Sequence, residues 1–262
     1  LRKIEGQVYL QVDFTYGEVV FSSDEKHHYM PENHPEILRD FQQEARIEAI
    51  SETFGYQAST KNWQKSLPAG EQLYTFFTRE IPVLRQLGEV RIGKKLRELY
   101  LDAQHHRPEI VIEENGSWLD IKFDVSGIQE SEINEVLRSL LQSAQFYTTE
   151  NGQVLSLESE EFQEASAALK KLRLSLEAKD GAIQVPLNQG LLLQEQFADQ
   201  ASFSAGFQQM TEDLIHPENF EAQLPENLHA ELRQYQEVGF RWLKMLSHYQ
   251  FGGILADEMG LG

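Results

Sequence analysis

The sequence predicts an α+β protein in which β-hairpins pack with helices. Two Asn-Gly pairs, at residues 115–116 and 151–152, each lie between segments rich in β-branched, aromatic and aliphatic residues, as expected of hairpin turns. Elsewhere, apolar residues recur at helical spacing, most clearly over residues 131–144. Because 40% of the 262 residues are apolar, the chain is long enough and apolar enough to bury a core.

The first ninety residues predict strands followed by helices. Apolar and polar residues alternate through residues 7–21, which predicts two strands joined by a turn at Tyr16-Gly17. A helix is expected from Pro35, which suits a first helical turn, to Gly55, which ends it. A second helical stretch should cover residues 71–87 and be interrupted at Ile81-Pro82, because proline lacks the N–H donor.

The middle of the chain predicts two hairpins with one helix between them. Residues 110–112 and 118–123 flank the first Asn-Gly pair, and residues 146–147 and 154–157 flank the second. Both carry the pattern E-N-G-x-x-L-x-[IL], although a single recurrence does not establish a repeat. Ser131 should cap the helix between them. Its expected buried stripe is Ile133, Val136, Leu137, Leu140, Leu141 and Ala144.

After residue 159 the periodicity is helical, with segments at 160–174, 187–197 and 203–215. Residues 216–228 are polar and contain two Pro-Glu-Asn sequences, which is typical of an interdomain linker. A strongly amphipathic helix should follow. Its apolar face is Leu232, Tyr235, Gly239, Trp242 and Leu246.

Composition excludes several classes of function. No cysteine is present, which excludes disulfide scaffolds and thiolate metal sites and fits a cytoplasmic location. No apolar run approaches the roughly 20 residues that span a bilayer. The formal net charge of −19 disfavours nonspecific binding of DNA or RNA by the whole surface. With neither an initiator Met nor a signal-peptide pattern at Leu1, the chain is expected to be a piece of a longer protein.

The last residues resemble a phosphate-binding loop. Such a loop needs a buried strand, a glycine-rich turn whose N–H groups converge on phosphate oxygens, and then Lys and Ser/Thr at the start of a helix. Residues 254–256 are the expected strand and residues 258–262 the expected turn, with glycines at 260 and 262. The sequence ends where the Lys and the hydroxyl residue would stand, so two thirds of the motif are present.

The surrounding sequence resembles a known family. Residues 232–243 (LRQYQEVGFRWL) and 252–262 (GGILADEMGLG) are similar, in order and spacing, to the adenine-reading Q-type motif and the first nucleotide motif of the Swi/Snf (Snf-two) family of DNA-dependent ATPases. The family usually has Pro where Gln234 stands, and the adenine contact is expected from Gln236. Asp257 replaces the first glycine of a generic loop, as it does in this family. More loosely, residues 115–157 are similar to the accessory domain that precedes the motor in bacterial members.

This resemblance implies three parts and a function. Residues 1–215 would be a helicase-associated accessory domain, 216–228 a linker, and 229–262 the truncated opening of a RecA-like α/β lobe, cut off inside the phosphate loop. The chain would be the regulatory or accessory N-terminal region of a DNA-dependent ATPase, a helicase-like DNA translocase or remodeller. The full-length protein would use ATP and Mg²⁺ and step along duplex DNA. The chain alone, without the downstream motifs and the second lobe, is expected not to hydrolyse ATP.

The resemblance also implies the site residues. Gln236 would read the adenine edge, and the backbone N–H groups of residues 259–262 would face the phosphates. No catalytic residue or metal ligand is expected in this piece. The complete nucleotide-binding set is Gln236, Asp257, Glu258, Met259, Gly260, Leu261 and Gly262.

The alternative is a free-standing acidic module that binds a protein partner and has no enzymatic activity. Residues 229–262 carry a net charge of −1 and the remaining 228 residues −18, so the acidity belongs to the accessory part. That part could bind a protein partner or the protein's own motor lobes, as a regulator or a DNA mimic. One basic run, Arg91, Lys94, Lys95 and Arg97, could contact DNA, although such a run is more often a solvated helix face.

Other polar groups favour ordinary surface roles. His27, His28, Glu32 and His34 have no spacing that enforces a metal geometry. The carboxylate pairs at residues 113–114 and 160–161 fall where solvated charge is expected, so they do not indicate an acid–base pair.

Overall fold

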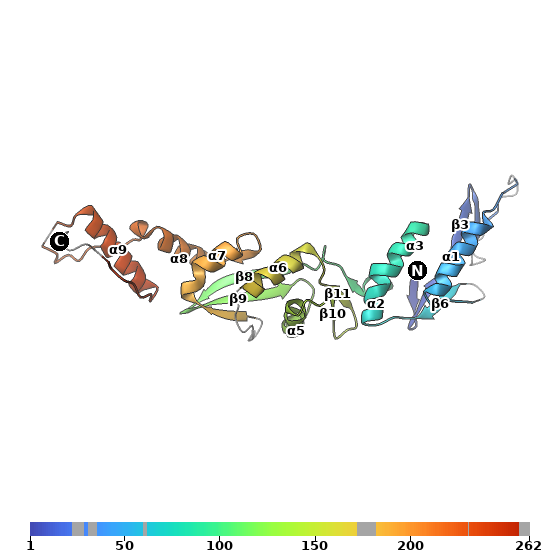
Figure 1. Cartoon of the computed structure of the whole chain (residues 1–262), viewed down its shortest axis with the longest axis horizontal. Helices are drawn as coiled ribbons and strands as arrows, with labels where there is room; N and C mark the ends of the chain where they lie inside the picture. The colour runs from blue at the N-terminus through green and yellow to red at the C-terminus, as the bar shows by residue number, and fades with distance from the viewer. Residues whose placement is uncertain (23–28, 31–35, 60–61, 172–181, 230, 257–262) are drawn as a thin grey trace. The chain divides into compact units, whose positions relative to one another are not determined.

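The structure is a computed structural model that describes residues 1–22, 29–30, 36–59, 62–171, 182–229 and 231–256 (Figure 1). These residues form a mixed α+β protein, as the sequence predicts. The chain divides into two compact units, and each is built from two separate stretches of sequence. The first unit comprises residues 1–105 and 144–158, and the second comprises residues 106–143 and 159–262. The two Asn-Gly hairpins therefore belong to different units.

The first unit contains a four-stranded antiparallel sheet with the order β1-β2-β6-β5. Its strands are β1 (Arg2–Ile4), β2 (Gln7–Leu10), β6 (Trp63–Ser66) and β5 (Gln57–Ala58). A separate hairpin follows, made of β3 (Asp13–Tyr16) and β4 (Val19–Ser22). The expected turn forms but is displaced by one residue: Tyr16 pairs with Val19, so the loop is Gly17-Glu18, and Gly17 adopts a φ of 61° there. The expectation of two strands in residues 7–21 was wrong, because β2 leaves the hairpin to pair with β1 and β6.

Helix α1 (Phe41–Thr53) begins six residues later than the proline at residue 35 predicts. The cap explains the difference: the side chain of Asp40 accepts a hydrogen bond from the N–H of Gln43 over 3.0 Å. The apolar residues of α1 do not form a buried face. Phe41 is 66% exposed, and the buried side chains of the helix are Glu44 and Ser51.

The predicted interruption near Pro82 is confirmed. Helix α2 (Glu71–Thr75) continues into a π-helical turn, η2 (Phe76–Glu80), and then into α3 (Ile81–Leu87). A proline at residue 82 cannot donate to the carbonyl four residues earlier, and the wider turn accommodates this loss. This helix packs over the sheet of the first unit. The shared core includes Val8, Leu10, Tyr56, Leu73, Phe76, Ile81 and Leu96.

The rest of the first unit is a small sheet with the order β10-β11-β7. A short helix, α4 (Lys94–Arg97), leads into β7 (Tyr100–Leu101). Strands β10 (Phe146–Thr148) and β11 (Val154–Ser156) form the second Asn-Gly hairpin, and β11 pairs in parallel with β7. Its connection spans residues 149–153, which is longer than that of the first hairpin. The shared sequence pattern thus does not produce a structural repeat.

The second unit is built on a mixed sheet with the order β12-β9-β8-β13. Its strands are β8 (Pro108–Asn115), β9 (Trp118–Val125), β12 (Ala182–Pro186) and β13 (Ala201–Phe203), the last two of which the sequence did not predict. The β8–β9 hairpin is confirmed, with its turn displaced by one residue. Asn115 pairs with Trp118, so the loop is Gly116-Ser117, and Gly116 alone in that loop has a positive φ, of 62°.

Helices cover this sheet. Helix α5 (Glu130–Leu141) packs against β9 and against α6 (Glu160–Lys171), while α6 and α8 (Ala205–Ile215) contact β8. Most of the predicted α5 stripe is buried, whereas Leu141 and Ala144 are partly exposed. The predicted cap at Ser131 was wrong: the helix begins one residue before it, and the N-cap, Gln129, makes no side-chain cap hydrogen bond. Along the chain, the 3-10 turn η3 (Leu187–Gln189) and α7 (Gly190–Gln196) connect β12 to β13, and α7 packs against α8.

Within the described residues, no helix is both long and apolar enough to cross a membrane.

Candidate functional site

The predicted nucleotide-binding residues begin on helix α9 (Gln234–His248). This is the expected amphipathic helix, except that Leu232 of its expected apolar face lies before the first helical residue. Gln236 lies in the first turn and is half-buried. Its side-chain oxygen accepts a hydrogen bond from the N–H of Arg233 over 2.9 Å. This contact fixes the side chain at the N-terminal end of the helix and satisfies one of the donors that every helix start leaves unpaired.

The other predicted binding residues, Asp257, Glu258, Met259, Gly260, Leu261 and Gly262, lie outside the described residues. The strand expected at 254–256 does not form: these residues have no regular structure, and Ile254 and Leu255 are 90% and 68% exposed. No strand among the described residues pairs with this segment. A buried parallel strand needs neighbours on both sides, so the sequence pattern alone cannot create it here.

The chain reverses direction at the end of α9. The N–H of Phe251 donates to the carbonyl of Leu246 over 2.8 Å, and the N–H of Gln250 donates to the carbonyl of Ser247 over 3.4 Å. This is the Schellman pattern of a helix C-terminus, in which the residue after the cap adopts a left-handed conformation. Gln250 has that conformation, with a φ of 58°. Gly253 then lies so close to Trp242 and Leu246 that a Cβ there would overlap them.

The reversed segment docks onto the body of the second unit through a hydrogen bond. The hydroxyl of Tyr249 donates to Oδ2 of Asp213 over 2.6 Å, and Oδ1 of Asp213 accepts from the side-chain amide of Gln209 over 2.8 Å. Asp213 lies on α8 and is only 7% exposed. Burial raises the pKa of Tyr249, and the hydrogen bond to Asp213 raises it further, so the hydroxyl remains a donor at neutral pH.

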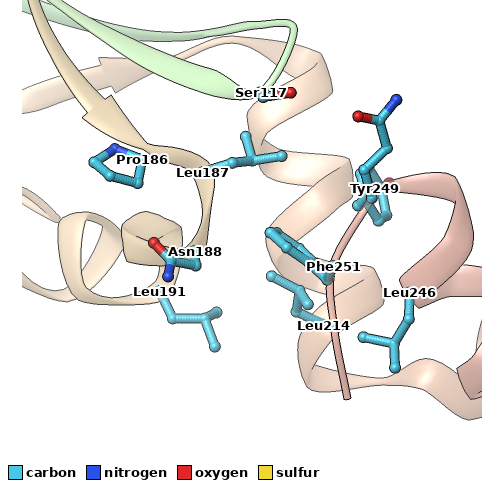
Figure 2. Close-up of a pocket in the computed structure, with 11 residues that line it drawn as sticks. Ser117, Pro186, Leu187, Asn188, Leu191, Leu214, Leu246, Tyr249 and Phe251 are labelled. Carbon is cyan, nitrogen blue, oxygen red and sulfur yellow. The ribbon is translucent and has the colours of Figure 1, made fainter.

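A cavity of about 500 Å³ lies beside this contact (Figure 2). The reversed segment and the end of α9 form one side of it, through Leu246, Tyr249 and Phe251. The other lining residues come from the β8–β9 turn, the end of β12, η3, α7 and α8. They are Ser117, Pro186, Leu187, Asn188, Leu191 and Leu214, with Gln250 and Gly252 at the reversed segment.

The segment predicted as a linker also contacts α9. It begins with a 3-10 turn, η4 (Pro217–Asn219), and the carbonyl of Glu218 accepts a hydrogen bond from the guanidinium of Arg241 over 2.8 Å. The ring of Phe220 lies 5.6 Å from that of His248 and 6.5 Å from that of Tyr249, between centroids. The last turns of α9 are therefore held by α8 and η4 together.

The predictions did not single out Asp213 or Tyr249. The sequence did contain one signal for Asp213. This residue lies three residues after Met210 and six after Phe207, so it falls on the apolar face of its helix. A carboxylate buried there needs a hydrogen-bond donor. Nothing comparable marks Tyr249, since its partner lies 36 residues away in sequence.

The remaining candidate residues make ordinary surface contacts. In the basic run, Arg91 pairs with Glu89 over 2.9 Å and Lys94 with Glu98 over 3.7 Å, which lowers the local positive excess. Glu113 pairs with Lys122 over 2.5 Å and Glu161 with Arg107 over 4.0 Å. The histidines at 27, 28 and 34 and the glutamate at 32 lie outside the described residues. In the part of the chain that the structure describes, no cluster could hold a metal ion.

The rest of the second unit is thus an α+β body that contacts helix α9 through Arg241 and the residue after the helix, Tyr249. Residues 1–225 match the family described as "Bacterial SNF2 helicase associated". Because the match covers most of the chain, the protein belongs to this family. The contacts of α9 thus join the family domain to residues that follow it.

The chain also has shorter matches to TATA-binding protein-associated factors and to ATP-dependent helicases. It is 44% identical over 52 residues to the TATA-binding protein-associated factor mot1 of Schizosaccharomyces pombe, covering 20% of this chain and 3% of that protein. It is 54% identical over 43 residues to an uncharacterized ATP-dependent helicase of Mycoplasma genitalium, a match that covers 16% of this chain and 4% of that protein. A match to TATA-binding protein-associated factor 172 of Homo sapiens is 51% identical over 45 residues and covers 17% of this chain and 2% of that protein. These matches span only a few per cent of the length of the curated relatives. No solved structure matches the chain.

Proposed function

We propose that this chain is the N-terminal accessory region of a Swi/Snf-type DNA-dependent ATPase, together with the opening of its motor. One observation carries the proposal. The helicase-associated match ends at residue 225, and the chain continues directly into a helix with Gln236 in its first turn and then into Asp-Glu-Met-Gly-Leu-Gly at 257–262. The short matches to ATP-dependent helicases support the same order of domains.

The position of Gln236 fits a nucleotide's adenine end. A primary amide can accept from the exocyclic N–H and donate to the ring nitrogen beside it, and here the amide is held at a helix N-terminus by the N–H of Arg233. The backbone N–H groups of residues 259–262 would face the phosphates. Bound ATP with Mg²⁺ would supply the phosphoanhydride bond whose cleavage drives the motor. The chain's own contribution is to select adenine and to orient the nucleotide.

The acidic family domain is the regulatory part in this proposal. With a net charge of −18 over residues 1–228, it is unsuited to grip a polyanion, so duplex DNA would be held by the motor downstream. Its partner would be the protein's own motor lobes or another protein. The chain alone would not hydrolyse ATP.

The test is ATP hydrolysis by the full-length protein with and without duplex DNA. We expect hydrolysis that duplex DNA stimulates and that is lost when the phosphate-loop lysine is replaced. A folded full-length protein that shows no DNA-stimulated hydrolysis would overturn the proposal and favour the acidic interaction module. Tight binding of duplex DNA by this 262-residue chain at physiological salt would overturn the regulatory role of the acidic part.

A further inference from the structure

The segment beyond the family domain is attached to it at three points. Tyr249 donates to Asp213, Arg241 donates to the carbonyl of Glu218, and the ring of His248 lies against Phe220. In each pair one residue precedes position 225, where the family match ends, and the other follows it.

The three contacts lie at the middle of α9, at its last residue and directly after it. Met245, in the same stretch, is the buried residue of the helix, at 1% exposure, while Gln236 is about two and a half turns earlier. The contacts therefore hold the end of α9, which precedes residues 249–256. Phe251 is six residues from Asp257, so an extended connection between them reaches only about 20 Å.

The contact at Asp213 is specific rather than incidental. Both of its oxygens are used, one by Gln209 and one by Tyr249, in a site that is only 7% exposed. If the tyrosine left, a buried carboxylate would lose a donor, which is more costly than losing an exposed hydrogen bond. The buried carboxylate of Asp213 therefore favours a hydroxyl donor, which Tyr249 provides.

We propose that α8 and η4 form an internal docking surface whose occupant is the chain's own segment 241–251, and that this docking couples the helicase-associated domain to the nucleotide site. The docking itself stands on the contacts above. The coupling rests on the proposed function, since it requires that Gln236 and residues 257–262 bind a nucleotide. In the sequence, the docked segment lies between Gln236 and residues 257–262, so the docking restrains the stretch of chain that connects them.

The docking is tested by amide hydrogen exchange in the 262-residue chain. Tyr249→Phe removes the hydroxyl and keeps the ring, and Tyr9→Phe is the matched control in the other unit. We expect the N–H groups of Tyr249 and Phe251 to exchange about tenfold faster in Tyr249→Phe, with no change in the β8–β9 hairpin. Asp213→Asn should act on the same two amides, and the double variant should add little to either single variant. Unchanged exchange in both single variants would overturn the docking.

The coupling is tested by nucleotide affinity in the full-length protein. We expect Tyr249→Phe to change the Kd for a non-hydrolysable ATP analogue at least threefold and Tyr9→Phe to leave it unchanged. An unchanged Kd in a variant whose two amides exchange faster would overturn the coupling while leaving the docking intact. If the wild-type full-length protein bound no ATP, the proposed function would fail, and the exchange result would still decide the docking.

Discussion

The N–H of Phe251 donates to the carbonyl of Leu246 over 2.8 Å, and this bond closes the turn that sends the chain back from the end of α9. The turn requires a left-handed residue between its two hydrogen bonds, and Gln250 supplies it with a φ of 58°. A side chain in that conformation is disfavoured by roughly 1–2 kcal/mol relative to glycine.

We therefore expect Gln250→Gly to stabilise the end of α9 by about 1 kcal/mol, whereas Gln250→Ala should give no such gain, because alanine has the same steric conflict. Urea unfolding followed through Trp242 fluorescence, in a Trp63→Phe and Trp118→Phe background, measures this difference. Equal stability of the glycine and alanine variants would contradict the assigned turn.

Lys65 and Glu80 form an ion pair that is largely removed from water in the first unit. Their side chains are 13% and 8% exposed, and the Lys65 ammonium also lies 4.4 Å from the centre of the Tyr56 ring. Lys65→Met leaves a buried carboxylate without its cation, and we expect it to lower the free energy of unfolding by about 3–5 kcal/mol. The double variant Lys65→Met, Glu80→Leu should recover most of that loss.

The matched control is Lys94→Met, which removes the exposed pair with Glu98 and should change stability by less than about 1 kcal/mol. Urea unfolding followed through Trp63, with Trp118 and Trp242 replaced by Phe, reports on the first unit alone. Similar losses for the two lysine variants would show that the Lys65 pair is not buried as described.

Glu44 should make stability depend on acid pH. Arg39 donates to it over 2.5 and 3.1 Å and Tyr16 over 2.7 Å. The hydrogen bonds from Arg39, then from Tyr16, hold the pKa of Glu44 below its usual value, against the opposing effect of burial. The stabilisation is therefore fully present above the unfolded-state pKa of about 4.3 and is lost as pH falls through the lower folded-state pKa.

We expect Glu44→Gln to lower the Tm at pH 7, and the gap from wild type to shrink as pH falls below about 4. Glu48→Gln, on an exposed position of the same helix, is the control and should show little gap at either pH. A gap for Glu44→Gln that stays constant down to pH 3 would mean that the carboxylate is not stabilised by these two donors.

The sequence predicts the elements that are determined by residues within them or next to them. The β8–β9 hairpin follows from an Asn-Gly turn between two long alternating runs, α5 from its apolar stripe, and the break near Pro82 from a missing donor. Strands β12 and β13 were missed, because their pairing is decided by distant partners: Ala201 pairs with Ile110 across 91 residues. A position such as Gln250 is equally hidden, since its left-handed conformation arises from the turn and not from a preference of glutamine.

The candidate site also has a part that the sequence predicts and a part that depends on the tertiary fold. Gln236 and the glycine-rich residues are recognisable because their spacing along the chain is itself the motif. The docking of the segment between them depends on Tyr249 meeting Asp213, a contact that belongs to the tertiary fold.

Our proposal that residues 229–262 are the beginning of an ATPase motor can be tested at Gln236. Gln236→Glu keeps an oxygen to accept from the N–H of Arg233, so the start of α9 is retained, but it removes the amide donor that adenine recognition needs. Gln234→Glu places the same charge on an exposed position of the same helical turn and is the control. The measurement is the KM for ATP, and the preference for ATP over GTP, in the full-length protein. We expect Gln236→Glu to raise the KM about tenfold and to erase the preference, whereas Gln234→Glu should change neither. Equal KM values and an unchanged preference in the two variants would contradict the proposal.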